Sequence, residues 1–504
     1  MLNDSTLNYF LILLTILHLS DLHRSENTPV SNNLLLSSIL IDMEKHEKED
    51  PAIKKCDIVI ITGDIITGAQ IDDHNYHETL TKQYKEAKNF LERLSEVLFD
   101  GDISRIFIVP GNHDVCWQIA KQAMESVETK DRKNILELLE SPNSPYRWSW
   151  EDQKLYRIND LDLYNQRFKF FKTFFDDLYK NQGYVYSLDE KNQFVNFIAP
   201  EKKAVFTGFN SLYGNDCYDR HGRIYPDNIA NNWFYIKKIS LTDIPIKIAF
   251  WHHGLESSEY GIDHLNRFEI LPLLIDRGYV LGLHGHQHRS NIVSYNYIDP
   301  KRFMPIISCG SLCADPRQLP SGYRRQYNII ELDELNYNVK IHVREWFDNA
   351  IFLPAKLHEF GGKSWCVMDL PLLQEAVVKR EQRMSNIAPL VERAELLIRD
   401  GKFREALTLL RPLPADIPIV NRLLIECLYE LALWDELIKV IQMPKNPDEL
   451  GMIVDAYNKK ALFQLADEVI ERYIIEKPNF DKGFIDSLKI RVKIETELGK
   501  VKTK

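Results

Sequence analysis

The sequence lacks the features that mark secreted and membrane proteins. Its seven cysteines among 504 residues are an odd number without short regular spacing, which argues against a disulfide framework and indicates free thiols in a reducing compartment. No stretch approaches the roughly 20 consecutive apolar residues that span a bilayer. The apolar run before residue 20 has neither the basic flank nor the small-residue cleavage site of a signal peptide. We therefore expect a cytoplasmic protein with no membrane partner.

An excess of positive charge is absent as well. The formal net charge is −10, so the chain as a whole does not attract nucleic acid or anionic lipid, although a local basic patch is compatible with this charge. The acidic excess lies entirely before residue 363, because the remainder carries equal numbers of basic and acidic side chains. The composition, 44% hydrophobic and 27% charged, is typical of globular proteins. At this length it predicts two or more domains.

What is present is a set of metal-ligand residues at the ends of apolar runs. The first run ends at Asp21-x-His23, and residues two apart on a strand share one face, so both side chains can reach one ion. Four later runs end in the same way: residues 56–62 at Gly63-Asp64, 105–110 at Gly111-Asn112-His113-Asp114, 246–251 at His252-His253, and 279–283 at His284-Gly285-His286-x-His288. Strands that alternate with helical segments predict a layered α/β fold with ligands gathered at the strand ends.

The residue types in these motifs indicate the kind of ion that they bind. Carboxylate, imidazole and amide donors suit divalent metal ions, and the absence of cysteine argues against a structural zinc site. The pattern leaves open which of His252 and His253 binds, and we favour His252 because it directly follows the apolar run.

Two further regions depart from the alternation of strands and helices. Residues of about 115–182 are helical, charged and aromatic, which predicts a cap inserted after the third ligand motif. Its phenylalanines are interpreted as cap core rather than as a platform for stacking bases. Gly361-Gly362 marks a boundary, and the residues beyond it show helical rather than strand patterns.

The region after this boundary carries a degenerate repeat. Aromatic residues recur at Phe403, Trp434 and Phe463, and a small or apolar residue follows each of them at the third position. This pattern is similar to tetratricopeptide-like helical hairpins. It predicts an all-α helical-repeat domain over residues 363–504, which binds a partner protein or a second copy of the chain.

The order and residue types of the five ligand motifs resemble the calcineurin-like metallophosphoesterase superfamily over roughly residues 14–345. The resemblance implies that residues 1–362 form a sandwich of two sheets flanked by helices. It also implies two divalent metal ions, with manganese expected and iron, zinc, nickel or cobalt as alternatives. The implied ligands are Asp21, His23 and His288 for the first ion, Asn112, His252 and His286 for the second, and Asp64 for both.

The resemblance further implies a mechanism. A hydroxide activated by the two ions attacks phosphorus in line with the leaving oxygen. His113 is similar to the family histidine beside the leaving group, which acts as an acid or an electrostatic stabiliser. Asp114 is a candidate to orient that histidine.

Departures from the family pattern narrow the substrate class. Protein serine/threonine phosphatases of this superfamily have Gly-Asp-x-x-Asp-Arg-Gly at the second motif, whereas residues 63–69 here read Gly-Asp-Ile-Ile-Thr-Gly-Ala. The missing carboxylate and arginine argue against protein phosphatase activity. The opening Leu-Ser-Asp-Leu-His and closing Gly-His-x-His look like the bacterial phosphodiesterase and exonuclease branch, so we expect a phosphodiester substrate in a nucleotide or nucleic acid. The alternatives are a phosphomonoesterase, or an interaction scaffold with a vestigial metal site.

Overall fold

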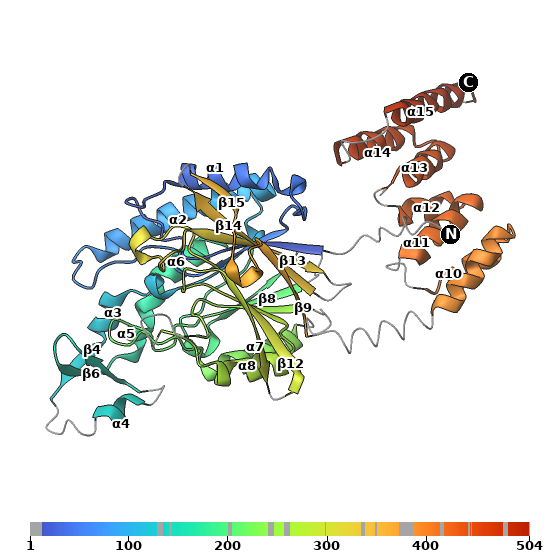
Figure 1. The fold of residues 1–504 in the computed structure, drawn as a ribbon. Helices are drawn as coiled ribbons and strands as arrows, with labels where there is room; N and C mark the ends of the chain where they lie inside the picture. The colour runs from blue at the N-terminus through green and yellow to red at the C-terminus, as the bar shows by residue number, and fades with distance from the viewer. Residues whose placement is uncertain are drawn as a thin grey trace. The chain divides into compact units, whose positions relative to one another are not determined.

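The computed structural model describes residues 13–128, 135–140, 144–199, 204–239, 246–256, 263–297, 299–333, 338–347, 350–371, 387–413, 418–441, 444, 446–476 and 482–502. The chain divides into two compact units, one formed by Phe10–Gln374 and the other mainly by Glu375–Lys504 (Figure 1). Each unit has its own hydrophobic core.

Seven strands form the first sheet of the larger unit. Their order is β15-β14-β13-β1-β2-β3, and β16 also pairs with β14. β1, β2 and β3 run parallel, whereas β13 is antiparallel to β1. β2 and β3 are buried at every position, which explains why their sequences are continuous apolar runs. The strands are β1 (Leu13–Leu19), β2 (Ile58–Thr62), β3 (Ile106–Val109), β13 (Gln326–Asp333), β14 (Asn338–Phe347), β15 (Ile351–Pro354) and β16 (Trp365–Asp369).

Six strands form the second sheet, in the order β11-β12-β10-β9-β8-β7. The four central strands β12, β10, β9 and β8 run parallel, and the two edge strands are antiparallel to their neighbours. The strands are β7 (Phe194–Ile198), β8 (Ala204–Phe209), β9 (Ile246–Phe250), β10 (Leu281–His284), β11 (Asn291–Tyr297) and β12 (Asp299–Ser308).

The two sheets pack against each other around a shared core, and helices cover their outer faces. Along β9, Ile248 and Phe250 belong to the core between the sheets, whereas Ala249 packs on the other face with residues of α7 (Pro226–Lys238) and α8 (Arg267–Asp276). The helices α1 (Asn32–Met43) and α2 (Tyr76–Phe99) contribute to the shared core and lie on the side opposite α7 and α8 (Figure 1). This arrangement confirms the predicted sandwich of two sheets flanked by helices.

The inserted segment after β3 contains a small sheet that the sequence pattern did not indicate. Its strands are four or five residues long and pair in the order β4-β6-β5, so each is too short to show a clear alternation. The phenylalanines Phe168, Phe171 and Phe175 are fully buried, but in the main core of the larger unit and not in a separate core of the inserted segment as expected. The elements are α3 (Trp117–Gln122), β4 (Met124–Val127), α4 (Ile135–Glu140), β5 (Tyr146–Ser149), β6 (Lys154–Ile158), α5 (Leu161–Asn165) and α6 (Lys169–Leu178).

The first sheet extends past the expected boundary at Gly361-Gly362, because β16 pairs with β14. Beyond it, every described residue from 387 onward belongs to helices and their connections. Phe403, Trp434 and Phe463 each begin a helix. The helices are residues 387–399, α10 (Phe403–Leu410), α11 (Pro418–Glu430), α12 (Trp434–Val440), α13 (Pro447–Lys459), α14 (Phe463–Glu476) and α15 (Lys482–Lys502). The predicted all-helical C-terminal region is thus confirmed.

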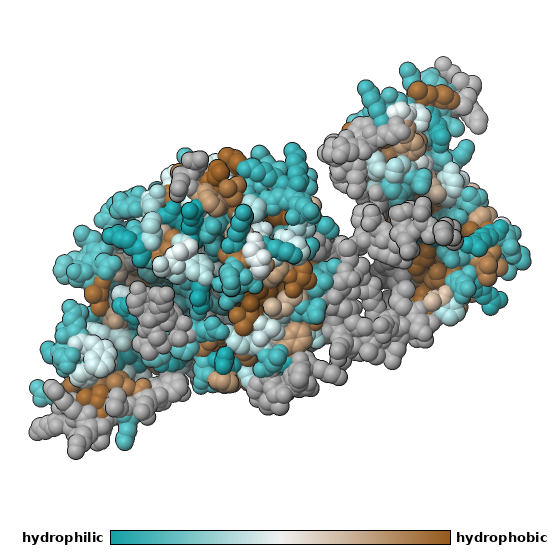
Figure 2. All heavy atoms as spheres, viewed as in Figure 1, coloured by the Kyte–Doolittle hydropathy of each residue, from teal (hydrophilic) through white to brown (hydrophobic). Residues whose placement is uncertain are grey.

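The surface is mostly polar on the face drawn in Figure 2, where hydrophobic residues are exposed in separate patches. Among the residues that the structure describes, no helix combines the length and apolar character needed to cross a membrane.

Candidate metal centre

The five predicted ligand motifs meet at one place in the larger unit. The parallel strands β1, β2 and β3 of the first sheet and β9 and β10 of the second deliver them at their carboxyl ends. Three groups of side chains gather there, and within each group the donor atoms lie within 4.8 Å of one another. The groups are Asp21 with His23 and His288, Asp64 with His23 and His113, and Asp21 with Asp64 and His252. Side chains separated by more than 260 positions therefore share one polar site.

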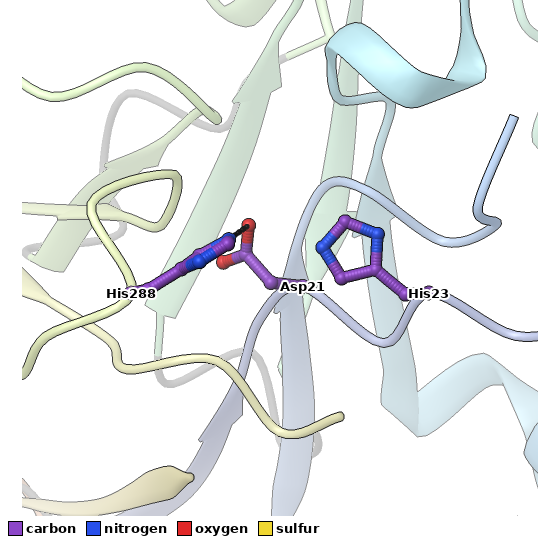
Figure 3. Close-up of side chains that lie close together, drawn as sticks. All are labelled: Asp21, His23 and His288. Atoms are coloured by element: carbon purple, nitrogen blue, oxygen red, sulfur yellow. Dashed lines mark hydrogen bonds and ion pairs between the residues drawn. The ribbon is translucent and has the colours of Figure 1, made fainter. Parts of the chain in front are cut away.

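Asp21 lies between His23 and His288 (Figure 3). The Nε2 atom of His288 is 3.1 Å from Asp21 Oδ1, and the backbone N–H of His286 donates to Asp21 Oδ2 at 3.1 Å. All three side chains of the group are largely withdrawn from solvent. One carboxylate and two imidazoles thus converge as donors for a single ion.

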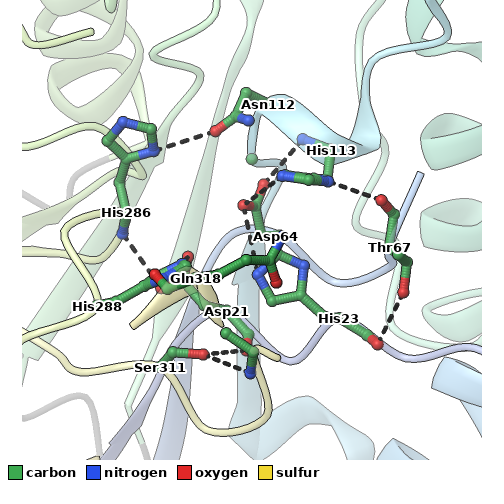
Figure 4. Close-up of polar contacts among 12 residues, drawn as sticks. Asp21, His23, Asp64, Thr67, Asn112, His113, His286, His288, Ser311 and Gln318 are labelled. Carbon is green, nitrogen blue, oxygen red and sulfur yellow. Dashed lines mark hydrogen bonds and ion pairs between the residues drawn. The ribbon is translucent and has the colours of Figure 1, made fainter. Parts of the chain in front are cut away.

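Asp64 is the centre of the constellation. Its Oδ2 atom lies 3.9 Å from His23 Nε2 and 3.8 Å from His113 Nε2 (Figure 4). Its Oδ1 atom lies 3.4 Å from His252 Nε2. The backbone N–H of His113 donates to Oδ1 at 2.9 Å. Because its two oxygens face different groups of histidines, this carboxylate has the placement needed to bridge two ions.

A second group of donors surrounds the amide of Asn112. Its Oδ1 atom is 2.9 Å from His252 Nε2 and 3.1 Å from His286 Nδ1, and these two ring nitrogens are 3.2 Å apart. Of the two adjacent histidines, His252 is thus the one directed at Asp64 and Asn112. His253 instead contacts Ser211 Oγ through Nδ1 at 3.0 Å.

Backbone carbonyls fix which nitrogen of several histidines faces the site. Nδ1 of His252 lies 2.7 Å from the carbonyl oxygen of Thr62, and Nδ1 of His288 lies 2.9 Å from that of Gln318. A carbonyl only accepts, so Nδ1 carries a proton and Nε2 is the ring nitrogen turned toward the carboxylates, where it can bind an ion in place of its own proton. Contacts of this kind orient imidazoles at metal sites.

The backbone at the site adopts conformations that are uncommon for residues other than glycine. The φ angles are 53° at Asp21, 43° at His23, 48° at Asp64, 69° at His286 and 52° at His288. All five lie in the left-handed region, where Asp and His are less disfavoured than most side chains. Strain of this kind clusters at functional sites because it sets the direction of a side chain.

Charge and burial at the site fit a bound cation. Burial alone would raise the pKa of Asp21, but His288 outweighs it and holds the value below its usual range. Burial would lower the pKa of His252, yet the Asp64 carboxylate raises it to about 9. Burial and the neighbouring His113 lower the pKa of His23 to about 3. Both ring nitrogens of this neutral His23 are buried without a hydrogen-bond partner among the described residues, which leaves a lone pair for an ion.

The two residues expected to serve catalysis have different surroundings. His113 is about one-third exposed, and its Nδ1 atom is 2.6 Å from the carbonyl oxygen of Thr67. Asp114 is buried, accepts hydrogen bonds from the backbone N–H groups of Gly111 and Ile65, and accepts a third from the hydroxyl of Tyr84. The contact that orients His113 therefore comes from Thr67.

Burial and the nearby charge of Asp64 raise the pKa of Asp114 to about 7. Its carboxyl group holds together the loops that carry Asp64 and Asn112, since it binds the backbone on both.

Sequence reasoning did not identify Asp263, whose Oδ2 atom lies 3.0 Å from His286 Nε2. This contact leaves the Nδ1 atom of His286 to face Asn112 and His252. Asp263 belongs to no motif and no apolar run, so the sequence carried no signal for it.

The part of the chain that holds this site matches a known protein family. Residues 14–290 match the family model of the calcineurin-like phosphoesterases. No curated protein matches the chain. Among solved structures, the TT1561 protein of Thermus thermophilus is 10% identical with a TM-score of 0.28, and the match covers 63% of this chain and 94% of that one.

Two further solved structures are similarly distant. The 5'-nucleotidase of Candida albicans is 12% identical with a TM-score of 0.29, and the match covers 63% of this chain but 46% of that one. Vps29 of Chaetomium thermophilum is 10% identical with a TM-score of 0.22, and the match covers 71% and 100% of the two chains. The family model spans more than half of the 504 residues. This chain is therefore a member of the calcineurin-like phosphoesterase family, a class of metal-dependent phosphoester hydrolases.

Proposed function

We propose that this protein hydrolyses phosphodiester bonds of a nucleotide or nucleic acid at a dinuclear metal centre. The observation that carries the proposal is the convergence of seven donor side chains in one site, with the carboxylate of Asp64 at its centre. We assign Asp21, His23 and His288 to one ion, Asn112, His252 and His286 to the other, and Asp64 to both. Manganese is the ion that we expect, by analogy with the family.

The metal ions and the residues around them would have different roles in catalysis. Bound divalent ions would supply Lewis-acid polarisation of the phosphoryl group and activation of a water nucleophile. Asp64 would bridge the two ions. The carbonyl of Thr62 keeps His252 turned toward Asp64, and that of Gln318 keeps His288 turned toward Asp21. Preorganised groups of this kind stabilise charge as it develops in the transition state, without further rearrangement.

His113 is the group that we assign to the leaving oxygen. Its Nδ1 proton is held by the Thr67 carbonyl, so Nε2 is directed toward Asp64 and the open side of the site. When protonated, Nε2 can donate to the departing oxygen. Its partial exposure leaves room for a substrate beside it.

The proposal is tested by a screen of substrates with the manganese-loaded protein. Bis-p-nitrophenyl phosphate, p-nitrophenyl phosphate, cyclic nucleotides, and single- and double-stranded DNA are compared under the same conditions. We expect the diesters to be cleaved faster than the monoester. Preference for p-nitrophenyl phosphate would establish a phosphomonoesterase instead, and inactivity on every substrate would favour an interaction scaffold.

Asp64→Ala is the matched control for this screen. We expect it to abolish turnover and to lose bound metal, because both halves of the site depend on this carboxylate. Metal content is measured by elemental analysis of the purified variant. A variant that retained both metal and turnover would remove Asp64 from the proposed mechanism.

A further inference from the structure

A polar cavity of about 500 Å³ lies beside His23, which we assign to the first ion. Its volume falls in the range of small-molecule sites. His23 itself lines the cavity, and so do Thr67 and Gln318, whose backbone carbonyls orient two further imidazoles of the site. The hydroxyl of Thr67 donates to the backbone carbonyl of His23 at 3.0 Å (Figure 4). The polar cavity thus has a proposed metal ligand in its wall.

The side chain of His23 indicates that a bound group completes its surroundings. This residue is only 4% exposed, and neither ring nitrogen has a hydrogen-bond partner among the described residues. Buried polar groups are paired in the large majority of cases, so such an imidazole in the wall of a cavity points to a ligand. A group bonded to a phosphate on the first ion would have the polar cavity next to it, because the ligand of that ion forms part of the wall.

The lining of the polar cavity consists mainly of hydroxyl, amide and carboxylate groups. Among the described residues that form it, none is a phenylalanine, tyrosine or tryptophan, so the cavity offers no such ring for a base to stack on. The side chains of Ser25, Asn27 and Asn75 line it and form no hydrogen bond within the described part of the chain. Hydroxyl and amide groups both donate and accept, which suits a neutral group that carries several hydroxyls.

Of the three carboxylates in the lining, one is free to bind a ligand. Glu78 pairs with Lys82 at 2.9 Å, and Asp315 pairs with Arg317 at 2.9 Å. Glu26 forms neither an ion pair nor a side-chain hydrogen bond with the described residues. An ionised carboxylate only accepts hydrogen bonds, through two oxygens, and acidic residues bind ribose hydroxyls in this way in dinucleotide sites. Because the lining has no positive excess, it does not suit a second phosphate.

We propose that the polar cavity binds the ribose on the non-leaving side of the scissile phosphodiester, with the two vicinal hydroxyls of the sugar donating to Glu26. His113, which we assign to the leaving oxygen, is not part of this lining. The assignment rests on the phosphodiesterase function proposed above, and it makes Glu26 a specificity-determining residue. The substrate class narrows to diesters of ribonucleosides, because the 2'-hydroxyl is the group that distinguishes them from deoxyribonucleosides.

The experiment compares two esters that differ by one hydroxyl. Uridine 5'-(p-nitrophenyl phosphate) and 2'-deoxyuridine 5'-(p-nitrophenyl phosphate) carry the same base and release the same p-nitrophenolate. The readout is the ratio of their kcat/KM values with the manganese-loaded full-length protein. We expect a preference of about ten-fold or more for the uridine ester, because the deoxy ester loses a hydrogen bond to a charged group. Glu26→Ala should lower the ratio by about five-fold or more, and Glu26→Gln, which keeps one accepting oxygen, should lower it less.

Glu96→Ala is the matched control, because Glu96 is an exposed carboxylate on α2 outside the lining, and its ratio should stay within two-fold of the unmodified protein. Glu26 is also exposed, so its substitution leaves the core intact, which circular dichroism verifies. The inference is overturned if the unmodified protein shows no preference, if Glu26→Ala lowers the two rates equally, or if Glu96→Ala changes the ratio as much. Absence of turnover on both esters would reject the phosphodiesterase function itself, which separates the two failures.

Discussion

The backbone conformation of Asp64 supports its assignment as a metal ligand. Its φ of 48° places it in the left-handed region, and a residue held in a sparsely populated conformation costs about 1–3 kcal/mol. Asp21, His23, His286 and His288 share this conformation. A fold retains such a cost where the resulting side-chain direction is needed. Its presence at five neighbouring residues therefore supports their assignment as ligands.

The role of His113 can be separated from metal binding. We expect His113→Ala to lower kcat by about 10²–10⁴-fold, the usual contribution of a general acid, while metal content stays near normal. The loss should be smaller for esters of p-nitrophenol than for alkyl esters, because a good leaving group needs less protonation. Steady-state kinetics and elemental analysis of the same preparation measure both. Loss of metal in this variant would make His113 a ligand instead.

Asp263 is expected to position His286. Asp263→Asn removes the negative charge beside His286 Nε2, so we expect the affinity for the second ion, to which His286 is assigned, to fall by about 10–100-fold. Manganese titration of the metal-free protein measures this affinity. Asp276→Asn, at an exposed carboxylate on α8, is the control. Equal affinities in the two variants would leave Asp263 without a positioning role.

For single residues, the sequence allowed the metal ligands to be predicted but not the groups that contact and orient them. The ligands could be predicted because each follows an apolar strand, which places it at the edge of a sheet. The partners of those ligands could not. The Thr67 carbonyl that orients His113 is a backbone group, and Asp263 reaches His286 across 23 positions. Asp114 was expected beside His113, yet its carboxyl group is occupied by the backbone of Gly111 and Ile65.

Between elements, a buried ion pair joins the end of α1 to β14. Arg344 on β14 binds Asp42 on α1, with an Nε–Oδ2 distance of 2.8 Å, and both side chains are almost fully buried. Burial alone would raise the pKa of Asp42, but its hydrogen bonds to His46 and Arg344 outweigh this and lower it. The ionised carboxylate is therefore stabilised by the fold.

This pair gives a prediction for pH. Because the pKa of Asp42 is lower in the folded than in the unfolded chain, its contribution to stability is complete above the unfolded pKa of about 4 and is lost as the pH falls through the folded value. We expect Asp42→Asn to reduce the free energy of unfolding by about 3 kcal/mol near pH 7. The difference from the unmodified protein should shrink below pH 4. Urea denaturation at several pH values measures it, and a difference independent of pH would contradict this assignment.

Strands could be predicted from the sequence where both of their faces are buried, because burial on two faces produces a continuous apolar run. The strands β1, β2, β3, β9 and β10 appear in the sequence as apolar runs and were predicted near their observed positions. The strands β4, β5 and β6 are short and half exposed, so their residues could not be distinguished from those of helices. β16 lies beyond the two glycines that suggested a boundary, and only its pairing with β14 reveals it.

For the whole molecule, the two units have separate cores. Among the described residues, Leu370 is the last member of the larger unit's core and Ile387 is the first member of the helical unit's core. All proposed metal ligands lie within the larger unit. Compact units with their own cores commonly fold alone.

Truncation after Gln374 tests this independence. We expect the shortened chain to keep its metal content and its rate on bis-p-nitrophenyl phosphate. Its melting temperature should shift by less than about 4 °C, the change that about 1 kcal/mol produces in a large domain. Differential scanning calorimetry and elemental analysis measure these properties. A truncated chain that unfolds or loses metal would show that the helical unit completes the fold of the larger one.

The backbone carbonyls that hold the imidazoles have a consequence for mutational tolerance. Substitution at Thr62, Thr67 or Gln318 changes a side chain but leaves the carbonyl that accepts from the ring. Substitutions at these three positions therefore leave the orientations of the imidazole rings unchanged, provided that the local backbone keeps its conformation. His286 relies on the side chain of Asp263, so one missense change can release it. The half of the centre that contains His286 is therefore the more sensitive to single amino-acid substitutions.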